Sequence, residues 1–338
     1  MKKAIFVLSL IILISCGKSP EEKYQQALEN FKASKTDAVP VIEASVMRHG
    51  GFIVDDDEIR SGSFSLYSVE GSKVLLYGSG GVEKYIVPEG APFFGAVVSH
   101  GICYIAAGKN LLIYNDSSTY DRVVTFPGKA EVSALVSWKE GILILAGRKL
   151  YILRSPLSKP EPVIEKAFAS PDKKTFRGFL TRSGNLVAVV LGYAGRYHIA
   201  LVDAARQKIV ANKISATGGS CYIDGRRVYY VSGGAGAWKV TRFDGKTKVK
   251  KTVGSFKSII NVSLFKSGFA LETPKGVELF DYKGAPVLFP ATGQLKGRTG
   301  DNLVVTIDKE KTISVPFGVF RKDLVLFQRE IVRASSGR

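Results

Sequence analysis

The stretches GICYIAAGKNLLIYND (101–116) and GILILAGRKLYILRS (141–155) decide the fold, because they follow one pattern about 40 residues apart. Each begins with a glycine suited to a tight turn, continues as a strand rich in apolar residues, and turns into a second strand. The pattern returns at Gly184, Gly225 and Gly268. A period of about 40 residues made of short strands is typical of the four-stranded blade of a β-propeller.

The flanks of each repeat supply the other two strands of a blade. Before each turn glycine lies another apolar run, such as FGAVVSH before Gly101, which we expect to be the innermost strand. After the second repeat strand comes a polar turn, and Asp203, Asp244 and Asp281 occupy this turn in three repeats. An aspartate there can bond the backbone two residues on. A fourth, outer strand follows, as in RVVTFPG (122–128).

The number of repeats predicts the size of the ring. Weaker repeats begin at Gly71 and near Gly300, which makes about seven blades, with six or eight as alternatives. The stretches GGFIVDDDE (50–58) and VFRKDLVLFQREI (319–331) are expected to share a blade and close the ring. The sequence therefore predicts an all-β fold, a propeller of about seven four-stranded blades over residues 41–338. Two packed β-sheets are the competing fold, and the regular period argues against them.

The repeat resembles quinoprotein-like and WD40-like propeller repeats over nearly all of the chain after residue 40. Quinoprotein enzymes of this type use a tryptophan-docking signature in each blade and acidic calcium ligands beneath the cofactor. This chain has two tryptophans, Trp138 and Trp238, in different kinds of strand. The signature is missing, so we expect a propeller without a quinone or any other cofactor.

The chain opens with the features of a secretory signal. Lys2 and Lys3 precede an apolar run, 4–14, which is too short to span a bilayer, since that takes about 20 apolar residues. The quartet at 13–16, Leu-Ile-Ser-Cys, resembles the bacterial lipobox. The resemblance implies cleavage between Ser15 and Cys16, a diacylglycerol on the Cys16 thiol and an acyl group such as palmitate on the new amine. A plain signal peptide with an incidental cysteine is the alternative.

A short helix is predicted directly after the cysteine. Ser19 can cap it, Pro20 suits its first turn, and Glu22 stands three residues after the cap. The domain organisation is then a signal peptide at 1–15, an anchor with helix and connector at 16–40, and the propeller. The apolar stripe of this helix consists of Tyr24, Ala27, Leu28 and Phe31.

The charge of the chain bears on its partners. The net charge is +18, and loss of Lys2 and Lys3 with the signal leaves +16, spread along the chain. An exported protein rarely meets nucleic acid, so we expect none. Other envelope proteins, anionic lipid or an acidic protein surface fit the compartment better. The alternative is that scattered lysines only keep a β-rich surface soluble and its strand edges apart.

Residues that could carry catalysis are few and scattered. His49, His100 and His198 lie apart, none with a second ligand at metal spacing, so neither a catalytic residue nor a metal site is predicted. Cys103 and Cys221 lie inside strand-like stretches and are expected to be buried free thiols, with a disulfide between them as the alternative. The glycine-rich turns GSGG (78–81) and GGAG (233–236) are followed by strands, which favours hairpin turns over phosphate-binding loops. The acidic run DDDE (55–58) lacks the spacing of a calcium loop.

Together these features predict a non-enzymatic, lipid-anchored protein-binding scaffold. The nearest analogy is architectural, to the propeller lipoprotein of the outer-membrane barrel-assembly machinery. An envelope lyase or hydrolase with a site in the central channel is the alternative. Gly17 stands where inner-membrane retention takes an aspartate, so we expect the outer membrane, facing the periplasm. Arg148, Arg196 and Arg226 lie in turns and are hypothesised to grip an acidic partner, against the alternative of solvated loop charge.

Overall fold

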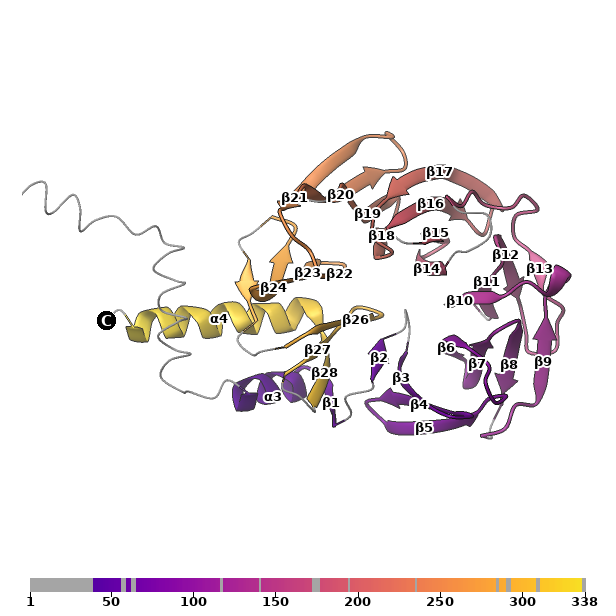
Figure 1. Ribbon diagram of the computed structural model, residues 1–338, viewed down its shortest axis with the longest axis horizontal. Helices are drawn as coiled ribbons and strands as arrows, with labels where there is room; N and C mark the ends of the chain where they lie inside the picture. The colour runs from indigo at the N-terminus through magenta and orange to yellow at the C-terminus, as the bar shows by residue number, and fades with distance from the viewer. Residues whose placement is uncertain are drawn as a thin grey trace, which may run out of the picture.

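The computed structural model describes residues 39–55, 59–61, 65–115, 118–139, 141–171, 177–193, 195–234, 236–283, 286–289, 293–307 and 311–335, with side chains as far as 329. Within these residues the strands form seven four-stranded antiparallel sheets that surround a common centre (Figure 1). The predicted fold, a seven-bladed β-propeller, is confirmed. A short helix, α3 (Val39–Arg48), precedes the first strand. The helix predicted from Ser19 and the lipobox lie outside the described residues.

Blades one to three are simple meanders, in which chain order equals the order from the centre outward. Blade one contains β2 (Arg60–Ser61), β3 (Leu66–Glu70), β4 (Lys73–Gly78) and β5 (Gly81–Ile86); blade two contains β6 (Phe93–Ser99), β7 (Ile102–Ala107), β8 (Asn110–Tyr114) and β9 (Arg122–Thr125); blade three contains β10 (Val132–Trp138), β11 (Gly141–Ala146), β12 (Lys149–Leu153) and β13 (Glu161–Pro162). The short 3-10 helix η1 (Pro127–Lys129) connects blades two and three.

Blades four to six follow the same order. Blade four contains β14 (Arg177–Ser183), β15 (Leu186–Tyr193), β16 (Arg196–Asp203) and β17 (Lys208–Ala216); blade five contains β18 (Cys221–Asp224), β19 (Arg227–Ser232), β20 (Trp238–Asp244) and β21 (Lys250–Phe256); blade six contains β22 (Asn261–Leu264), β23 (Gly268–Thr273), β24 (Gly276–Asp281) and β25 (Val287–Leu288). In blades two to six the innermost strand is the apolar run before the turn glycine, as predicted.

The repeat at Gly71 differs from this rule. Gly71 lies between β3 and β4, which are the second and third strands of blade one, and not between the first and second. The innermost strand, β2, is only two residues long and pairs Arg60 with Tyr67 and Ser61 with Leu66. So short a strand has no apolar pattern of its own. The apolar run before Gly71 is therefore the second strand of the blade, and not the innermost strand that the repeat predicts.

The ends of the chain share blade seven. Its inner three strands are β26 (Leu295–Thr299), β27 (Asn302–Thr306) and β28 (Lys311–Pro316), and its outermost strand is β1 (Phe52–Asp55). β1 runs antiparallel to β28, with Phe52 opposite Ser314. Backbone hydrogen bonds between the two ends therefore close the ring, and the innermost strand β26 contacts β2 of blade one.

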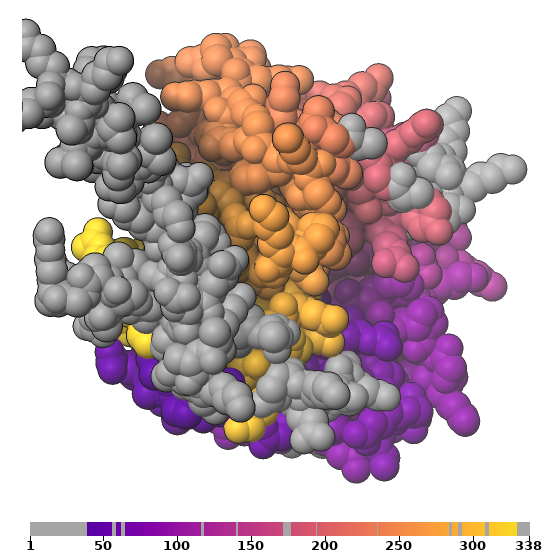
Figure 2. All heavy atoms as spheres, turned by 60° about the vertical axis from the view of Figure 1, so that its left-hand side comes forward, coloured from indigo at the N-terminus to yellow at the C-terminus, as the bar shows by residue number. Residues whose placement is uncertain are grey.

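The prediction that residues 319–331 form a closing strand is wrong, because they belong to helix α4 (Phe317–Ser335). Phe317, Phe320 and Leu324 follow one another at intervals of three and four, and all three are buried. The outermost position of blade seven is taken by β1, which completes the four strands of the blade without this segment. Figure 2 shows this closing side, where indigo atoms of α3 lie beside yellow atoms of the C-terminal segment.

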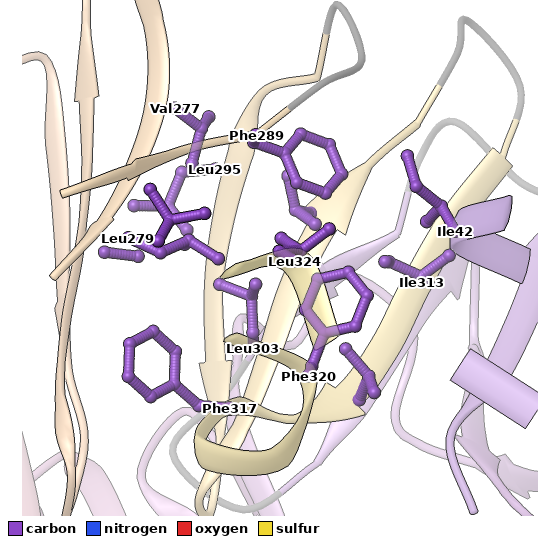
Figure 3. Close-up of a cluster of buried hydrophobic side chains, with 14 of the residues drawn as sticks. Ile42, Val277, Leu279, Phe289, Leu295, Leu303, Ile313, Phe317, Phe320 and Leu324 are labelled. Atoms are coloured by element: carbon purple, nitrogen blue, oxygen red, sulfur yellow. The ribbon is translucent and has the colours of Figure 1, made fainter. Parts of the chain in front are cut away.

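Both helices are held by the largest buried cluster. It joins α3, α4, blade six and blade seven into one core (Figure 3). The cluster includes Ile42 of α3, Phe320 of α4, Leu279 of blade six and Ile313 of blade seven. Burial of such side chains stabilises a fold by about 25 cal/mol per Å² of apolar surface, so the helices brace the side at which the ring closes.

The turn residues behave largely as predicted. Asp244 Oδ1 accepts a hydrogen bond from the N–H of Lys246 at 2.8 Å, and Asp281 Oδ1 accepts one from the N–H of Lys283 at 2.7 Å. Asp203 reaches one residue further, to the N–H of Arg206. The stretch GSGG (78–81) joins β4 to β5 as a hairpin, and 233–236 joins β19 to β20, with residue 235 outside the described part.

Candidate partner-binding faces and central channel

The meander of each blade divides its turns between two faces of the disc. Turns that join the first to the second strand, and the third to the fourth, lie on one side, which we call the lower face. Turns that join the second to the third strand, and the connections between blades, lie on the other side, the upper face. This follows from antiparallel pairing, in which successive turns alternate between the two edges of a sheet.

The three predicted partner-binding arginines do not share a face. Arg148 lies in the turn between β11 and β12, and Arg196 begins β16 directly after the turn from β15, so both are on the upper face of neighbouring blades. Arg226 lies in the turn between β18 and β19, on the lower face. Arg196 and Arg226 are exposed, and Arg148 is partly exposed. One surface can therefore contain Arg148 and Arg196 but not Arg226.

Arg298 of the innermost strand β26 reaches across the central channel. Its Nη2 donates hydrogen bonds to the carbonyl oxygen of Cys221 in β18 at 2.9 Å and to Oγ1 of Thr181 in β14 at 3.3 Å. Its Nη1 donates to the carbonyl oxygen of Gly300 at 3.2 Å. The guanidinium thus links blade seven to blades four and five.

The surroundings of this guanidinium are mostly neutral. The ring centre of Tyr222 lies 5.6 Å from Arg298 Cζ, a cation–π contact. Burial lowers the pKa of Arg298 below its usual value, while Cys221, Tyr222 and Asp301 act in the opposite direction. Among the described residues no carboxylate lies within 4.0 Å of the guanidinium.

The sequence patterns considered above did not point to Arg298. The signal that could have found it is an arginine in the run LKGRT, at the position of an innermost strand.

The histidines have separate environments. His49 Nε2 lies 2.9 Å from Asp323 Oδ2 and so joins α3 to α4. His100 occupies the turn between β6 and β7 with a φ of 52°, and its Nδ1 lies 3.1 Å from Ser99 Oγ. His198 lies within β16, partly buried. No three His, Cys, Asp or Glu side chains gather at metal-binding distance in the part of the chain that the structure describes.

The two cysteines outside the N-terminal segment are free and buried, as expected. Cys103 lies in β7 of blade two and Cys221 in β18 of blade five. Burial raises the pKa of each thiol to about 12. Neither thiol is therefore a nucleophile at neutral pH, because the reactive form is the thiolate.

Comparison with known proteins identifies the fold. No protein-family model matches the sequence, and no curated protein matches it. The structure of BBS1N in complex with ARL6DN aligns with a TM-score of 0.52 and 9% identity, over 77% of this chain and 91% of that one. The WD40 domain of Neurospora crassa Pan2 aligns with a TM-score of 0.50 and 11% identity, over 80% and 91%. At such identities the likeness concerns the fold alone.

The fold and its seven sheets define the class of protein as a seven-bladed β-propeller. Helices α3 and α4 frame its closing blade, which is an addition to the repeat. Within the described residues, neither helix has the length and apolar character needed to cross a membrane.

Proposed function

We propose that this protein is a lipid-anchored scaffold of the bacterial cell envelope, which binds another envelope protein through the upper face of its propeller. Cys16 carries the lipid in this proposal, after cleavage between Ser15 and Cys16, and the outer membrane facing the periplasm is the location. The support for the anchor is the lipobox and signal pattern of the sequence. A role in an outer-membrane assembly or other envelope complex follows by analogy with the propeller lipoprotein named above.

The observation that carries the scaffold proposal is the occupation of the central channel. A propeller enzyme needs titratable or metal-binding groups that converge there. The channel instead holds the Arg298 guanidinium, hydrogen-bonded to a threonine hydroxyl and to backbone carbonyls. This arrangement favours a structural brace and a function on the faces of the disc, over the lyase or hydrolase alternative. BBS1N, a neighbour in fold, was solved with a protein partner, ARL6DN.

Arg148 and Arg196 are the residues that we propose for the partner surface. They lie on the upper face of adjacent blades, and an arginine fork can bond both oxygens of a carboxylate. Glycines at 147 and 195 precede them in tight turns, and Arg196 is exposed while Arg148 is partly exposed. The partner of this surface is accordingly an acidic protein.

The test is capture of partners from detergent-solubilised envelopes with the tagged full chain. The double variant Arg148→Glu/Arg196→Glu should recover less of the partner than the unchanged protein, and raised salt should reduce recovery as well. Lys84→Glu/Lys251→Glu is the matched control, because it makes the same charge change at exposed positions on outer strands. Equal recovery with both double variants would reject this surface and direct attention to the stripe of Tyr24, Leu28 and Phe31.

A further inference from the structure

Exposed basic side chains gather on the lower face of blades four and five, which are neighbours in the ring (Figure 1). They lie in the turns and at the strand ends that meet this face. Three come from the first-to-second turns and five from the third-to-fourth turns. This basic lower face consists of Arg182, Arg206, Lys208, Arg226, Arg227, Lys246, Lys248 and Lys250, all exposed.

The concentration of charge is a property of these two blades and not of the whole disc. Residues 177–257 contain 15 Lys and Arg and 3 Asp, a net charge of +12, whereas the whole chain has +18. Two thirds of the net charge therefore lie in one continuous stretch of the sequence, and the expectation that the charge is spread along the chain is wrong. Since like charges repel, such a concentration on one side is typical of a surface that meets an anionic partner.

The acidic residues of this face offer little compensation. Asp244 is used by its own turn, where the N–H groups of Thr247 and Lys246 hold the pKa of its carboxyl below the usual value. Asp203 accepts from the backbone of Arg206, and its Oδ2 lies 3.8 Å from the Arg206 side chain. The third aspartate, Asp224 at the end of β18, is exposed. The eight cations of this face outnumber its three carboxylates, and this leaves a net positive potential for a partner.

The two blades present their charges as one rigid unit. The N–H of Gly225 in blade five donates to Ser183 Oγ in blade four at 3.0 Å. Lys248 Nζ of blade five donates to the carbonyl oxygen of Val210 in blade four at 2.7 Å. Because these bonds cross the boundary between the blades at the lower face, the relative positions of the cations are held by the fold.

An apolar side chain projects from the same face. Val249 stands between Lys248 and Lys250 in the turn from β20 to β21, and its exposed fraction is 60%. The turn is closed by hydrogen bonds from the N–H of Lys248 to Asp244 O and from the N–H of Asp244 to Val249 O. A fixed valine between two lysines combines an apolar tip with cations at its sides, as in interfacial segments that enter the headgroup layer.

We propose that the basic lower face of blades four and five docks on the anionic surface of a lipid bilayer. Phospholipid phosphates attract many spaced cations at once, and they demand no fixed geometry from a lysine. A protein partner would favour aromatic anchors, and in the described residues of this face Val249 is the exposed large apolar side chain. This docking uses the face opposite to Arg148 and Arg196, and it does not depend on their role or on the lipid at Cys16.

The first test compares vesicle binding of full-length variants. The chain is incubated with phosphatidylcholine vesicles and, separately, with vesicles that also contain phosphatidylglycerol. The measured quantity is the ratio of protein bound to the second vesicles to protein bound to the first, in which insertion of the apolar N-terminus into both kinds of vesicle cancels. The quadruple variant Arg182→Gln/Arg226→Gln/Arg227→Gln/Lys246→Gln should lower this ratio by about 600-fold, since each of the four cations near such a surface contributes a factor of roughly five. Lys73→Gln/Lys84→Gln/Lys109→Gln/Lys275→Gln, with the same change in charge at exposed positions elsewhere, should leave the ratio near its original value.

The second test reports which face touches the bilayer. Val249→Trp places a tryptophan in the turn directly before β21, on the lower face. Ile260→Trp places one directly before β22, in the connection between blades five and six on the upper face, and the two positions are 60% and 61% exposed. Anionic vesicles should shift the emission of the first tryptophan to shorter wavelength and leave that of the second unchanged. Equal binding to both vesicle types, an equal loss in the two quadruple variants, or a shift at Ile260→Trp alone would overturn the proposal. Equal binding would leave an acidic protein as the partner for this face.

Discussion

Nη2 of Arg298 in blade seven donates a hydrogen bond to the carbonyl oxygen of Cys221 in blade five, at 2.9 Å across the central channel. The same nitrogen reaches Thr181 in blade four, so one side chain of blade seven contacts two other blades, at residues 117 and 77 positions earlier in the chain. A guanidinium with carbonyl partners in this position acts as a brace between inner strands, which otherwise meet only their neighbours in the ring.

Arg298→Ala should therefore destabilise the propeller. The change removes a charged donor and leaves the Cys221 carbonyl without that partner, which we expect to lower the free energy of unfolding by about 2–4 kcal/mol. Urea denaturation followed by circular dichroism measures the effect. The control Arg196→Ala, at an exposed turn position, should change it by less than about 0.5 kcal/mol. A stability of Arg298→Ala equal to that of the control would show that the brace contributes nothing.

The contact between α3 and α4 should make stability depend on pH in the acid range. Asp323 Oδ2 accepts a hydrogen bond from Ser45 Oγ at 2.9 Å and lies 2.9 Å from His49 Nε2. Burial by itself would raise the pKa of Asp323, but the bonds from His49 and Ser45, with the charges of His49 and Arg48, lower it below the ordinary aspartate value of 3.8. The ionised carboxylate is the form that the fold favours.

Because the folded pKa is lowered, the stabilisation is present above pH 3.8 and is lost as the pH falls through the folded value. Asp323→Asn should thus be less stable than the unchanged protein by about 1 kcal/mol at pH 7, and the difference should shrink below pH 4. Urea titrations at several pH values provide the measurement. Glu70→Gln, at an exposed strand end, is the control without such a trend. A difference that grows on acidification contradicts the assignment.

Closure of the ring depends on a glycine between α3 and β1. A Cβ atom at Gly51 would lie 2.5 Å from the Ser314 carbonyl oxygen and 2.8 Å from Val46 Cγ1. Gly51→Ala should push β1 away from β28 and lower the free energy of unfolding by about 1–3 kcal/mol. Gly80→Ala is the matched control, because a Cβ atom there meets nothing within 4 Å. Equal melting temperatures for Gly51→Ala and Gly80→Ala would argue against tight packing between α3, β1 and β28.

The buried thiols should resist modification in the folded protein. Burial raises the pKa of Cys103 and Cys221 to about 12, so almost no thiolate is present at pH 8. Iodoacetamide should label neither residue in buffer and both in denaturant, as peptide mass spectrometry can record. Rapid labelling of either one without denaturant would mean that its blade opens readily.

Acylation of Cys16 is the prediction that tests the anchor. Mass spectrometry of the mature N-terminus should find a lipid-modified cysteine at residue 16, and Cys16→Ser should release the protein from envelope membranes. Fractionation should place the lipidated form in the outer membrane, because Gly17 is not an aspartate. A mature protein that begins at any other residue would reject lipidation but leave the fold and both proposed faces intact.

The sequence by itself determined the repeat and the order of strands in five of the blades. Each of these blades folds from about 40 neighbouring residues, and turn glycines such as Gly101 and Gly184 mark its hairpins, so the information is local. The alternation of turns between faces was also implicit in this order. This alternation places Arg226 on the face opposite to that of Arg148 and Arg196. The hypothesis of one acidic-partner surface grouped the three arginines only because they share a residue type and lie in turns.

Only the tertiary structure decided how the ring closes and what fills its centre. The pairing of Phe52 with Ser314 joins the two ends of the chain, and residues 317–335 form a helix beside this blade and not its closing strand. The contact of Arg298 with Thr181 and Cys221 arises between segments that are 117 and 77 residues apart. Such contacts depend on the curvature of the whole ring, since a local pattern of apolar and polar residues specifies a strand but not the distant strand across the channel.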